Sequence, residues 1–412
     1  MVKVLMNRGS EPRTNEVTRI ERLSSVRLRS SARVAVACGG SGGHLFPGVA
    51  VAECLRTSGC EVILFISAKV QDLEAIRQVV SAEALILPAT ALQRGERFAF
   101  FVNFVRSYNF AKMCFHSRPV NAAITMGGFT GPPVILAARA LRASTFLHES
   151  NTIPGRANRL LSRVVTRVFV SFASTAAQMH CRHVTITGTP IRTQFRYRES
   201  ETARKKLGLN TRHPVILIMG GSQGASAVNQ ACIRALPAFA KGLPNAQWLH
   251  LTGVKDHEKV KQAYAKLRLN AIVLPFLAEM ELLLAAASLV ISRAGASSLA
   301  ELAAMRVPAL LMPYQLAVGN HQWHNAVAFE KTHLARVIEE QEATPERLAQ
   351  SVYELLGCAT ARATHQAEGR IDNDKPAAEQ VADAILETIT GNGISLTGPR
   401  HPSSQGVRVW SD

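Results

Sequence analysis

The sequence is poor in the features that mark secreted, membrane-spanning or nucleic-acid-binding proteins. Its seven cysteines form no Cys-x-x-Cys pair and have no histidine at zinc-ligand spacing, which is typical of reduced thiols in a cytosolic protein. No apolar run approaches the roughly 18 residues that a membrane span requires, and the N-terminus has no signal-peptide core. Aromatic residues make up only 6%, and no RNA-binding signature accompanies the net charge of +17. We therefore expect a cytoplasmic protein that does not bind nucleic acid.

Acidic residues are scarce in the first half of the chain. Residues 34–190 hold fifteen Lys/Arg against seven Asp/Glu, whereas residues 191–390 hold twenty-two against nineteen. A basic half of this kind attracts an anionic lipid surface, a nucleic acid or a pyrophosphate, although scattered solvated charge explains it equally simply.

Apolar strand-like runs alternate with helical patterns along most of the chain, which predicts two doubly wound α/β domains. We expect strands at 34–38, 61–66, 121–126, 144–148, 168–171, 184–187, 215–219, 246–251, 271–274, 289–292 and 308–312. The predicted organisation is a disordered extension over 1–33, a first domain over 34–192, a second domain over 193–375, a C-terminal helix over 376–390 and a disordered tail over 391–412.

Two glycine clusters follow predicted strands, Cys-Gly-Gly-Ser-Gly-Gly-His at 38–44 and Gly-Gly-Ser-Gln-Gly at 220–224. Each lies at a strand-to-helix turn, where glycine lets the backbone approach a ligand and the helix N-terminus favours phosphate. Two such turns predict two phosphorylated ligands in one cleft.

Further turns add polar side chains at predicted strand ends. Met126-Gly-Gly-Phe-Thr-Gly131 is a second anion-binding turn or a plain turn. The polar residues of His148-Glu-Ser-Asn151 lie at a carboxyl edge, where α/β folds bind ligands.

Arg192 either reaches a diphosphate across the cleft or forms a hinge salt bridge. Glu301 either accepts ribose hydrogen bonds or complements a helix dipole. Residues 313–316 and 321–325 supply amides and imidazoles for sugar hydroxyls.

Taken together and in this order, these motifs resemble the MurG family from about residue 34 to 390. The resemblance implies a GT-B fold, with two Rossmann-like domains facing a central cleft. It also implies inverting transfer of N-acetylglucosamine from UDP-N-acetylglucosamine to lipid I in peptidoglycan synthesis, with lipid II and UDP as products. The family acts at the cytoplasmic face of the bacterial inner membrane.

The resemblance also implies the residues of the site. The donor-binding residues are Ser41, Gly42, Gly43, Asn151, Arg192, Ser222, Leu277, Ala296, Ser297, Ser298, Leu299, Ala300, Glu301 and Gln322. The acceptor-binding residues are Gly40, His44, Gly127, Gly128 and Phe129. The chain departs from the family where Phe129 replaces a common Tyr, where Thr189 replaces a usual Asn, and at Gly319-Asn320, which is often acidic.

Inverting transfer needs a base for the acceptor hydroxyl, and His44 is the candidate because its ordinary pKa lies near physiological pH. The alternative role of His44 is donation to the acceptor pyrophosphate. We expect no metal cofactor, since Asp372-Asn-Asp374 imitates a metal-binding Asp-x-Asp motif but precedes Lys375-Pro376 and predicts a helix start.

Residues 92–118 hold seven of the chain's aromatic residues among five arginines and lysines. An interfacial helix places aromatics at the acyl boundary and cations on anionic headgroups. A core helix is the alternative, and it accounts for Phe101, Phe104 and Tyr108 at helical spacing. The aromatic residues are Phe98, Phe100, Phe101, Phe104, Tyr108, Phe110 and Phe115, and the cations are Arg94, Arg97, Arg106, Lys112 and Arg118.

Other functions fit less well. A dinucleotide dehydrogenase needs Gly-x-Gly-x-x-Gly after the first strand, but Leu45 occupies the last position. The alternatives that remain are another GT-B glycosyltransferase acting on a glycolipid and a non-catalytic UDP-sugar-binding homologue.

Overall fold

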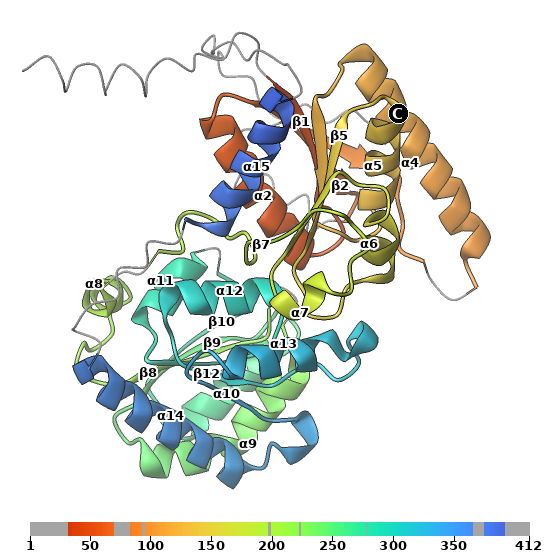
Figure 1. Cartoon of the computed structure of the whole chain (residues 1–412). Coiled ribbons are helices and arrows are strands. Elements are labelled where there is room, and N and C mark those ends of the chain that lie inside the picture. The colour runs from red at the N-terminus through yellow and green to blue at the C-terminus, as the bar shows by residue number, and fades with distance from the viewer. Residues whose placement is uncertain are drawn as a thin grey trace, which may run out of the picture.

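The computed structural model describes residues 32–69, 83–92, 95–196, 199–221, 224–277, 279–365 and 375–391. Within these ranges the chain forms two parallel sheets with helices on both faces (Figure 1), as the strand–helix alternation predicts. The predicted extension up to residue 31, the predicted tail from residue 392, Arg94, Ser222 and the Asp372-Asn-Asp374 motif lie outside the described residues. The predicted boundaries are wrong by a few residues, since Arg33 begins the first strand (Arg33–Ala37) and Gly391 ends the last described helix (Ala377–Gly391).

The first sheet has the strand order β3-β2-β1-β4-β5-β6-β7, and every pairing is parallel. Its strands are β1 (Arg33–Ala37), β2 (Glu61–Ser67), β3 (Glu83–Leu87), β4 (Ala122–Thr125), β5 (Ser144–Glu149), β6 (Arg167–Val170) and β7 (Val184–Ile186). Its helices are α2 (Gly42–Thr57), α4 (Arg97–Ser117), α5 (Gly131–Ala140), α6 (Arg156–Leu161) and α7 (Ala173–Ala176).

The second sheet repeats this order over six strands, β10-β9-β8-β11-β12-β13. Its strands are β8 (Val215–Met219), β9 (Gln247–Leu251), β10 (Ala271–Leu274), β11 (Leu289–Ser292), β12 (Ala309–Leu311) and β13 (Ala335–Val337). The remaining α-helices are α8 (Ser200–Lys206), α9 (Ser226–Gly242), α10 (His257–Lys266), α11 (Met280–Ala286), α12 (Ala296–Met305), α13 (His321–Glu330), α14 (Pro345–His365) and α15 (Ala377–Gly391), and the 3-10 turns are η1 (Val318–Asn320) and η2 (Glu340–Glu342).

Each sheet is buried on both faces, because successive strand residues enter different cores. Val34 and Val36 of β1 pack with α2, whereas Ala35 and Ala37 pack with the α4 and α5 side. In β8, Leu217 packs in one core, whereas its neighbours Ile216 and Ile218 pack in the core on the opposite face of the sheet. This explains why the strands appear in the sequence as continuous apolar runs.

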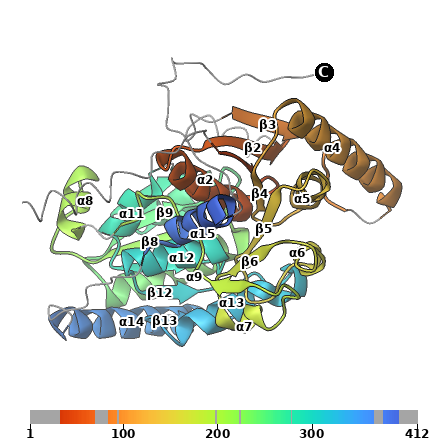
Figure 2. The same ribbon diagram turned by 45° about the horizontal axis from the view of Figure 1, so that its top comes forward.

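The C-terminal helix α15 completes the core of the first sheet. Val381, Ile385 and Ile389 are buried against the α2 side of β1. Figures 1 and 2 both show α15 beside α2, although the two helices lie far apart in the sequence. The last helix of the described residues therefore packs on the first sheet.

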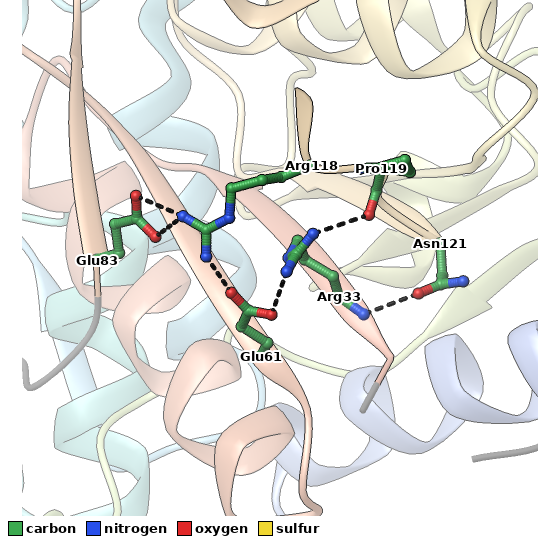
Figure 3. A network of polar contacts seen from close by, with 6 residues as sticks. All are labelled: Arg33, Glu61, Glu83, Arg118, Pro119 and Asn121. Atoms are coloured by element: carbon green, nitrogen blue, oxygen red, sulfur yellow. Dashed lines mark hydrogen bonds and ion pairs between the residues drawn. The ribbon is translucent and has the colours of Figure 1, made fainter. Parts of the chain in front are cut away.

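An ion-pair network fixes the amino edge of the first sheet (Figure 3). Glu61 bonds Arg33 at 2.5 Å and also pairs with Arg118, whose guanidinium reaches Glu83 at 2.7 Å. Burial raises the pKa of Glu61, but its bonds to Arg33 and Arg118 outweigh this and lower it below the ordinary value. The network joins the first residues of β1, β2 and β3 to the end of α4, on the edge opposite the glycine turns.

Candidate functional site

The first glycine turn leads from β1 into α2. Ser41 precedes the helix, and its carbonyl accepts the backbone N–H groups of His44 and Leu45, both at 3.0 Å. The first turn of α2 has no acidic residue. The free N–H groups and positive dipole end of α2 are therefore not neutralised by a side chain of that turn, as anion binding requires.

The glycine turn that follows β4, over residues 126–131, packs directly on the glycine turn that precedes α2. Thr130 donates its hydroxyl to the carbonyl of Gly39 at 3.1 Å. A Cβ added to Gly128 would lie 3.0 Å from Cδ2 of His44, and one added to Gly40 would lie 2.8 Å from the ring of Phe129. The structure thus brings together the predicted acceptor residues, which are Gly40, His44, Gly127, Gly128 and Phe129.

The His148–Asn151 segment differs from the expectation that its polar side chains face a ligand. His148 is buried, and burial lowers its pKa to about 4. Its Nε2 donates to the carbonyl of Gly188 at 2.9 Å. The Glu149 carboxylate accepts bonds from the Asn151 amides and from Gly155 and Asn158 (Asn151 N, Asn151 Nδ2, Gly155 N and Asn158 Nδ2). Only Asn151 remains partly exposed, so the other three residues of the segment, His148, Glu149 and Ser150, shape the loop instead.

Arg192 lies in the connection between the two sheets, with only 7% of its surface exposed. Its guanidinium lies 4.9 Å from the ring centroid of Phe46 and 5.1 Å from that of Phe195. Its Nε has no hydrogen-bond partner within the described ranges. Burial raises the pKa values of Glu53 and Glu301, and the positive charge of Arg192 opposes this rise at both carboxyl groups. Among the described residues Arg192 forms no ion pair, so the alternative of a hinge salt bridge is not seen there.

Helix α12 brings the second domain to the first glycine turn. It follows β11 through Gly295 and opens with five of the predicted donor-binding residues, Ala296, Ser297, Ser298, Leu299 and Ala300. The Leu299 side chain is buried in the core, whereas the alanines and serines are small and partly exposed. Ser297 donates its hydroxyl to the carbonyl of Gly43 at 3.4 Å. Two of the predicted donor-binding segments, 254 residues apart in the chain, therefore meet at their helix N-termini.

Glu301 lies in the second turn of α12. Burial raises its pKa to about 7, the Arg192 charge opposes this, and the Glu281 charge adds to it. A carboxyl group whose pKa is raised to about 7, close to the charge of Arg192, is a candidate for a functional role.

The segment after β12 is tied to α13 and to the first domain. Gln322 accepts the backbone N–H of Tyr314 at 2.9 Å, which orients its amide. Asn325 is fully buried and accepts from the N–H and hydroxyl of Thr152, at 2.9 and 3.0 Å. Its amide also donates to Asn151 at 3.1 Å. The sequence predicts that Asn325 binds sugar hydroxyls, but its side chain instead forms hydrogen bonds to Thr152 and Asn151 that join the two domains.

A buried polar network stands behind the glycine turn at 220–224, of which residues 222 and 223 lie outside the described part. Asn229 in α9 donates to the Thr252 carbonyl and the Asp256 carboxylate, both at 2.9 Å. Its Oδ1 accepts from Nε2 of His250 at 3.1 Å, and Tyr264 donates to the other ring nitrogen at 3.1 Å. Burial lowers the pKa of His250 to about 3, so the ring is neutral. Nothing in the motif pattern singled out this network.

Two other residues complete the comparison with the sequence predictions. Leu277 is partly exposed and packs against the core on the α12 side of the second sheet. Lys69, which the sequence reasoning did not single out, follows β2 and donates to the carbonyl of Gly40 at 2.8 Å. Its position after a strand adjacent to β1 was the available signal.

On the outer side of the first domain, α4 lies along α5 (Figures 1 and 2). Phe98 is 81% exposed and Phe101 is 64% exposed, whereas Ala111 and Phe115 are buried. The core-helix interpretation is therefore wrong for Phe101. Phe100 is partly buried, with its ring centroid 6.4 Å from that of Phe104. Among the described helices, none is both long and apolar enough to cross a bilayer.

The comparisons with known proteins agree with this arrangement. Residues 34–170 match the glycosyltransferase family 28 N-terminal domain, and residues 215–384 match the family 28 C-terminal domain. The UDP-N-acetylglucosamine–N-acetylmuramyl-(pentapeptide) pyrophosphoryl-undecaprenol N-acetylglucosamine transferase of Halothermothrix orenii is 36% identical over 77% of this chain and 88% of its own length. The protein of the same name from Anaeromyxobacter sp. strain K is 34% identical over 91% of this chain and 98% of its own.

Solved structures show the same two-domain arrangement. The crystal structure of MurG from Acinetobacter baumannii has a TM-score of 0.66 and 26% identity, covering 86% of this chain and 99% of that one. A glycosyltransferase of kitacinnamycin, 15% identical with a TM-score of 0.61 over 87% of this chain and 100% of its own, shares the fold. The predicted GT-B fold is confirmed.

Proposed function

Since this chain belongs to the MurG family of glycosyltransferases, we propose that it transfers N-acetylglucosamine from UDP-N-acetylglucosamine to lipid I, giving lipid II and UDP. The acceptor oxygen is the C4 hydroxyl of the muramoyl sugar. It forms a bond to C1 of N-acetylglucosamine, the bond from C1 to the UDP oxygen breaks, and the hydroxyl proton passes to a base. The observation that carries the proposal is the contact of Ser297 with Gly43, because it joins the donor helix to the glycine turn.

The donor half of the site is assigned to α12 and its surroundings. The small residues at the start of α12 admit a nucleotide to the helix N-terminus, and Glu301 accepts hydrogen bonds from the ribose hydroxyls. Gln322, oriented by Tyr314, is assigned to the sugar. Ser222 is assigned to the UDP phosphates by its place in the 220–224 turn.

In this proposal, positive groups of the protein stabilise the negative charge of the departing diphosphate. Arg192 is buried and lacks a hydrogen-bond partner at Nε within the described ranges, and helix N-termini add positive potential. We accordingly propose that the reaction needs no metal cofactor.

The acceptor half is assigned to the two packed glycine turns. His44 lies against Gly128 and next to the helix N-terminus of α2, so a diphosphate bound there would bring the acceptor sugar near its ring. We assign His44 as the base that takes the C4 hydroxyl proton. Donation from His44 to the acceptor pyrophosphate is the competing assignment, and the two differ in their kinetics.

We also propose that α4 docks the enzyme on the cytoplasmic face of the inner membrane. Phe98 and Phe101 are exposed large apolar side chains, and exposed Arg97 and Arg106 interleave with them. Aromatics at the acyl boundary and cations on anionic headgroups would hold the first domain near a polyprenyl-linked acceptor. The lipid II formed there would feed peptidoglycan synthesis, on which cell shape and cell division depend.

The experiment is UDP release from UDP-N-acetylglucosamine, with and without lipid I, together with mass analysis of the lipid product. We expect release that depends on lipid I and a product heavier by one N-acetylglucosamine residue. Release with a different glycolipid in place of lipid I would favour the alternative GT-B transferase. Binding of UDP-N-acetylglucosamine without release under any acceptor would favour a non-catalytic homologue.

A further inference from the structure

Lys69 lies at the mouth of the first glycine turn. It stands two residues after the end of β2, which pairs in parallel with β1 so that Phe65 is level with Ala37. The carboxyl ends of both strands therefore meet at one edge of the sheet. The pairing therefore brings Lys69, which belongs to none of the predicted motifs, beside the segment that leads into α2.

The ammonium of Lys69 lies close to both glycine turns. Its Nζ donates to the carbonyl of Gly40 at 2.8 Å and lies 5.5 Å from the centroid of the Phe129 ring. The first contact belongs to the turn before α2 and the second to the turn before α5. An ammonium has three N–H donors, and the Gly40 carbonyl takes one of them.

The electrostatics at this place favour a bound anion. Neither α2 nor α5 has an acidic residue in its first turn, so the positive ends of both helices are uncompensated by their own first turns. The Gly40 carbonyl, in contrast, presents negative partial charge there, and the Lys69 ammonium offsets it. Cation–π contact with Phe129 holds the ammonium without using its N–H donors.

We propose that Lys69 binds the diphosphate of the acceptor and thereby makes the site selective for acceptors linked through a diphosphate. This inference rests on the proposed function, because it adds a residue to the acceptor half of the same site. Phe129 has no hydroxyl to donate to such a ligand, and Lys69 supplies a charged donor over the same ring.

The test measures steady-state kinetics with a short-chain, water-soluble analogue of lipid I that keeps the diphosphate, so that membrane docking does not enter. Lys69→Met should raise the acceptor KM about tenfold and leave kcat within about twofold. The KM for UDP-N-acetylglucosamine and the thermal midpoint should not change. Lys69→Arg, which keeps the charge, should retain most of the acceptor affinity.

Arg182→Met is the matched control, because it also removes one positive charge from an exposed position of the first domain. Arg182 precedes β7 and so lies at the amino edge of the sheet, away from the glycine turns. It should leave the acceptor KM unchanged.

An unchanged acceptor KM in Lys69→Met, with an active wild-type enzyme, overturns the inference alone. So does an equal rise in both substrate KM values, which would indicate a structural role. A wild-type protein that transfers no sugar to the analogue or to lipid I overturns the proposed function and this inference with it.

Discussion

Asn325 of α13 accepts two hydrogen bonds from Thr152, one from its backbone N–H and one from its hydroxyl, across 173 residues of sequence. Both residues are buried. The pair fastens the loop after β5 to α13, the helix that also carries Gln322, which is assigned to the donor sugar.

Asn325→Ala should destabilise the protein by about 1–3 kcal/mol, because it leaves the buried N–H of Thr152 without an acceptor. Urea unfolding followed by circular dichroism measures this. Gln350→Ala, which removes an exposed bond to Glu354 on α14, is the control and should stay within about 0.5 kcal/mol of wild type. Equal stability of the two variants would mean that the interdomain bonds do not hold in solution.

UDP affinity should depend on the protonation of Glu301. Its pKa is raised to about 7, so the carboxylate that accepts ribose hydrogen bonds is lost as the pH falls through neutrality. Calorimetric titration should show UDP binding weaken from about pH 8 to about pH 6. Glu301→Ala should weaken binding by about 1–3 kcal/mol at the higher pH. Glu301→Gln is the control for the titration of UDP itself, and an unaltered pH profile in it would remove Glu301 from the effect.

The same carboxyl should make stability fall as the pH rises. Its ordinary pKa is 4.5 and its folded pKa is about 7, so between these values the unfolded chain loses the proton while the folded chain keeps it. The unfolded state then binds fewer protons, and the free energy of unfolding decreases with rising pH across this window. Denaturant unfolding at several pH values should show a smaller decrease in Glu301→Gln than in wild type. A slope unaffected by the substitution would contradict the raised pKa.

His44→Ala tests the base assignment. If His44 takes the hydroxyl proton, kcat should fall by roughly 10²-fold or more while the affinity for UDP-N-acetylglucosamine changes little. Steady-state kinetics with both substrates measure this. A rise in acceptor KM at intact kcat would instead assign His44 to the acceptor pyrophosphate.

Asn229→Ala should weaken UDP binding and stability together. Asn229 lies near the start of α9, directly after the 220–224 turn that is proposed to hold the UDP phosphates. The substitution removes the donors to Thr252 and Asp256 and leaves the buried Nε2–H of His250 without its acceptor. We expect a loss of about 1–3 kcal/mol in unfolding free energy. Tyr264→Phe removes only the bond to the far ring nitrogen, so it should lower stability without affecting UDP affinity. Unweakened UDP binding by a folded Asn229→Ala would show that the network supports the core alone.

Membrane docking should depend on the exposed phenylalanines of α4. Phe98→Ser/Phe101→Ser should lower co-sedimentation with anionic vesicles, and added salt should weaken the binding of wild type. Val254→Ser changes an equally exposed apolar residue of the second domain and should not matter. Wild-type binding to neutral vesicles at high salt that equals binding to anionic ones would contradict the electrostatic part.

The sequence predicts most of the fold, since buried parallel strands leave continuous apolar runs. It missed β3 and β13 because edge strands need less apolar sequence: β3 includes partly exposed residues, and β13 is three residues long with Arg336 exposed. The predicted strand ends locate the glycine turns and α12 correctly because the residues there are local in sequence.

Roles that depend on contacts between distant segments were not predictable. His148 and Glu149 look like ligand-facing residues, but bonds to Gly188 and Asn158 occupy them. Lys69 carries no motif, and only the parallel pairing of β2 with β1 brings it to Gly40. Such pairings arise from the folded sheet, whereas motifs record only neighbours along the chain.

The position of α15 sets the order in which this protein can finish folding during synthesis. A ribosome releases the first sheet early, but α15, which covers one of its faces together with α2, follows the whole second sheet in the chain. Until then the apolar side chains of α2 and β1 facing α15 remain open to water and to other nascent chains. The helices α9 and α14, which cover one face of the second sheet, lie between its strands or directly after them in the chain, so that sheet waits for no distant segment.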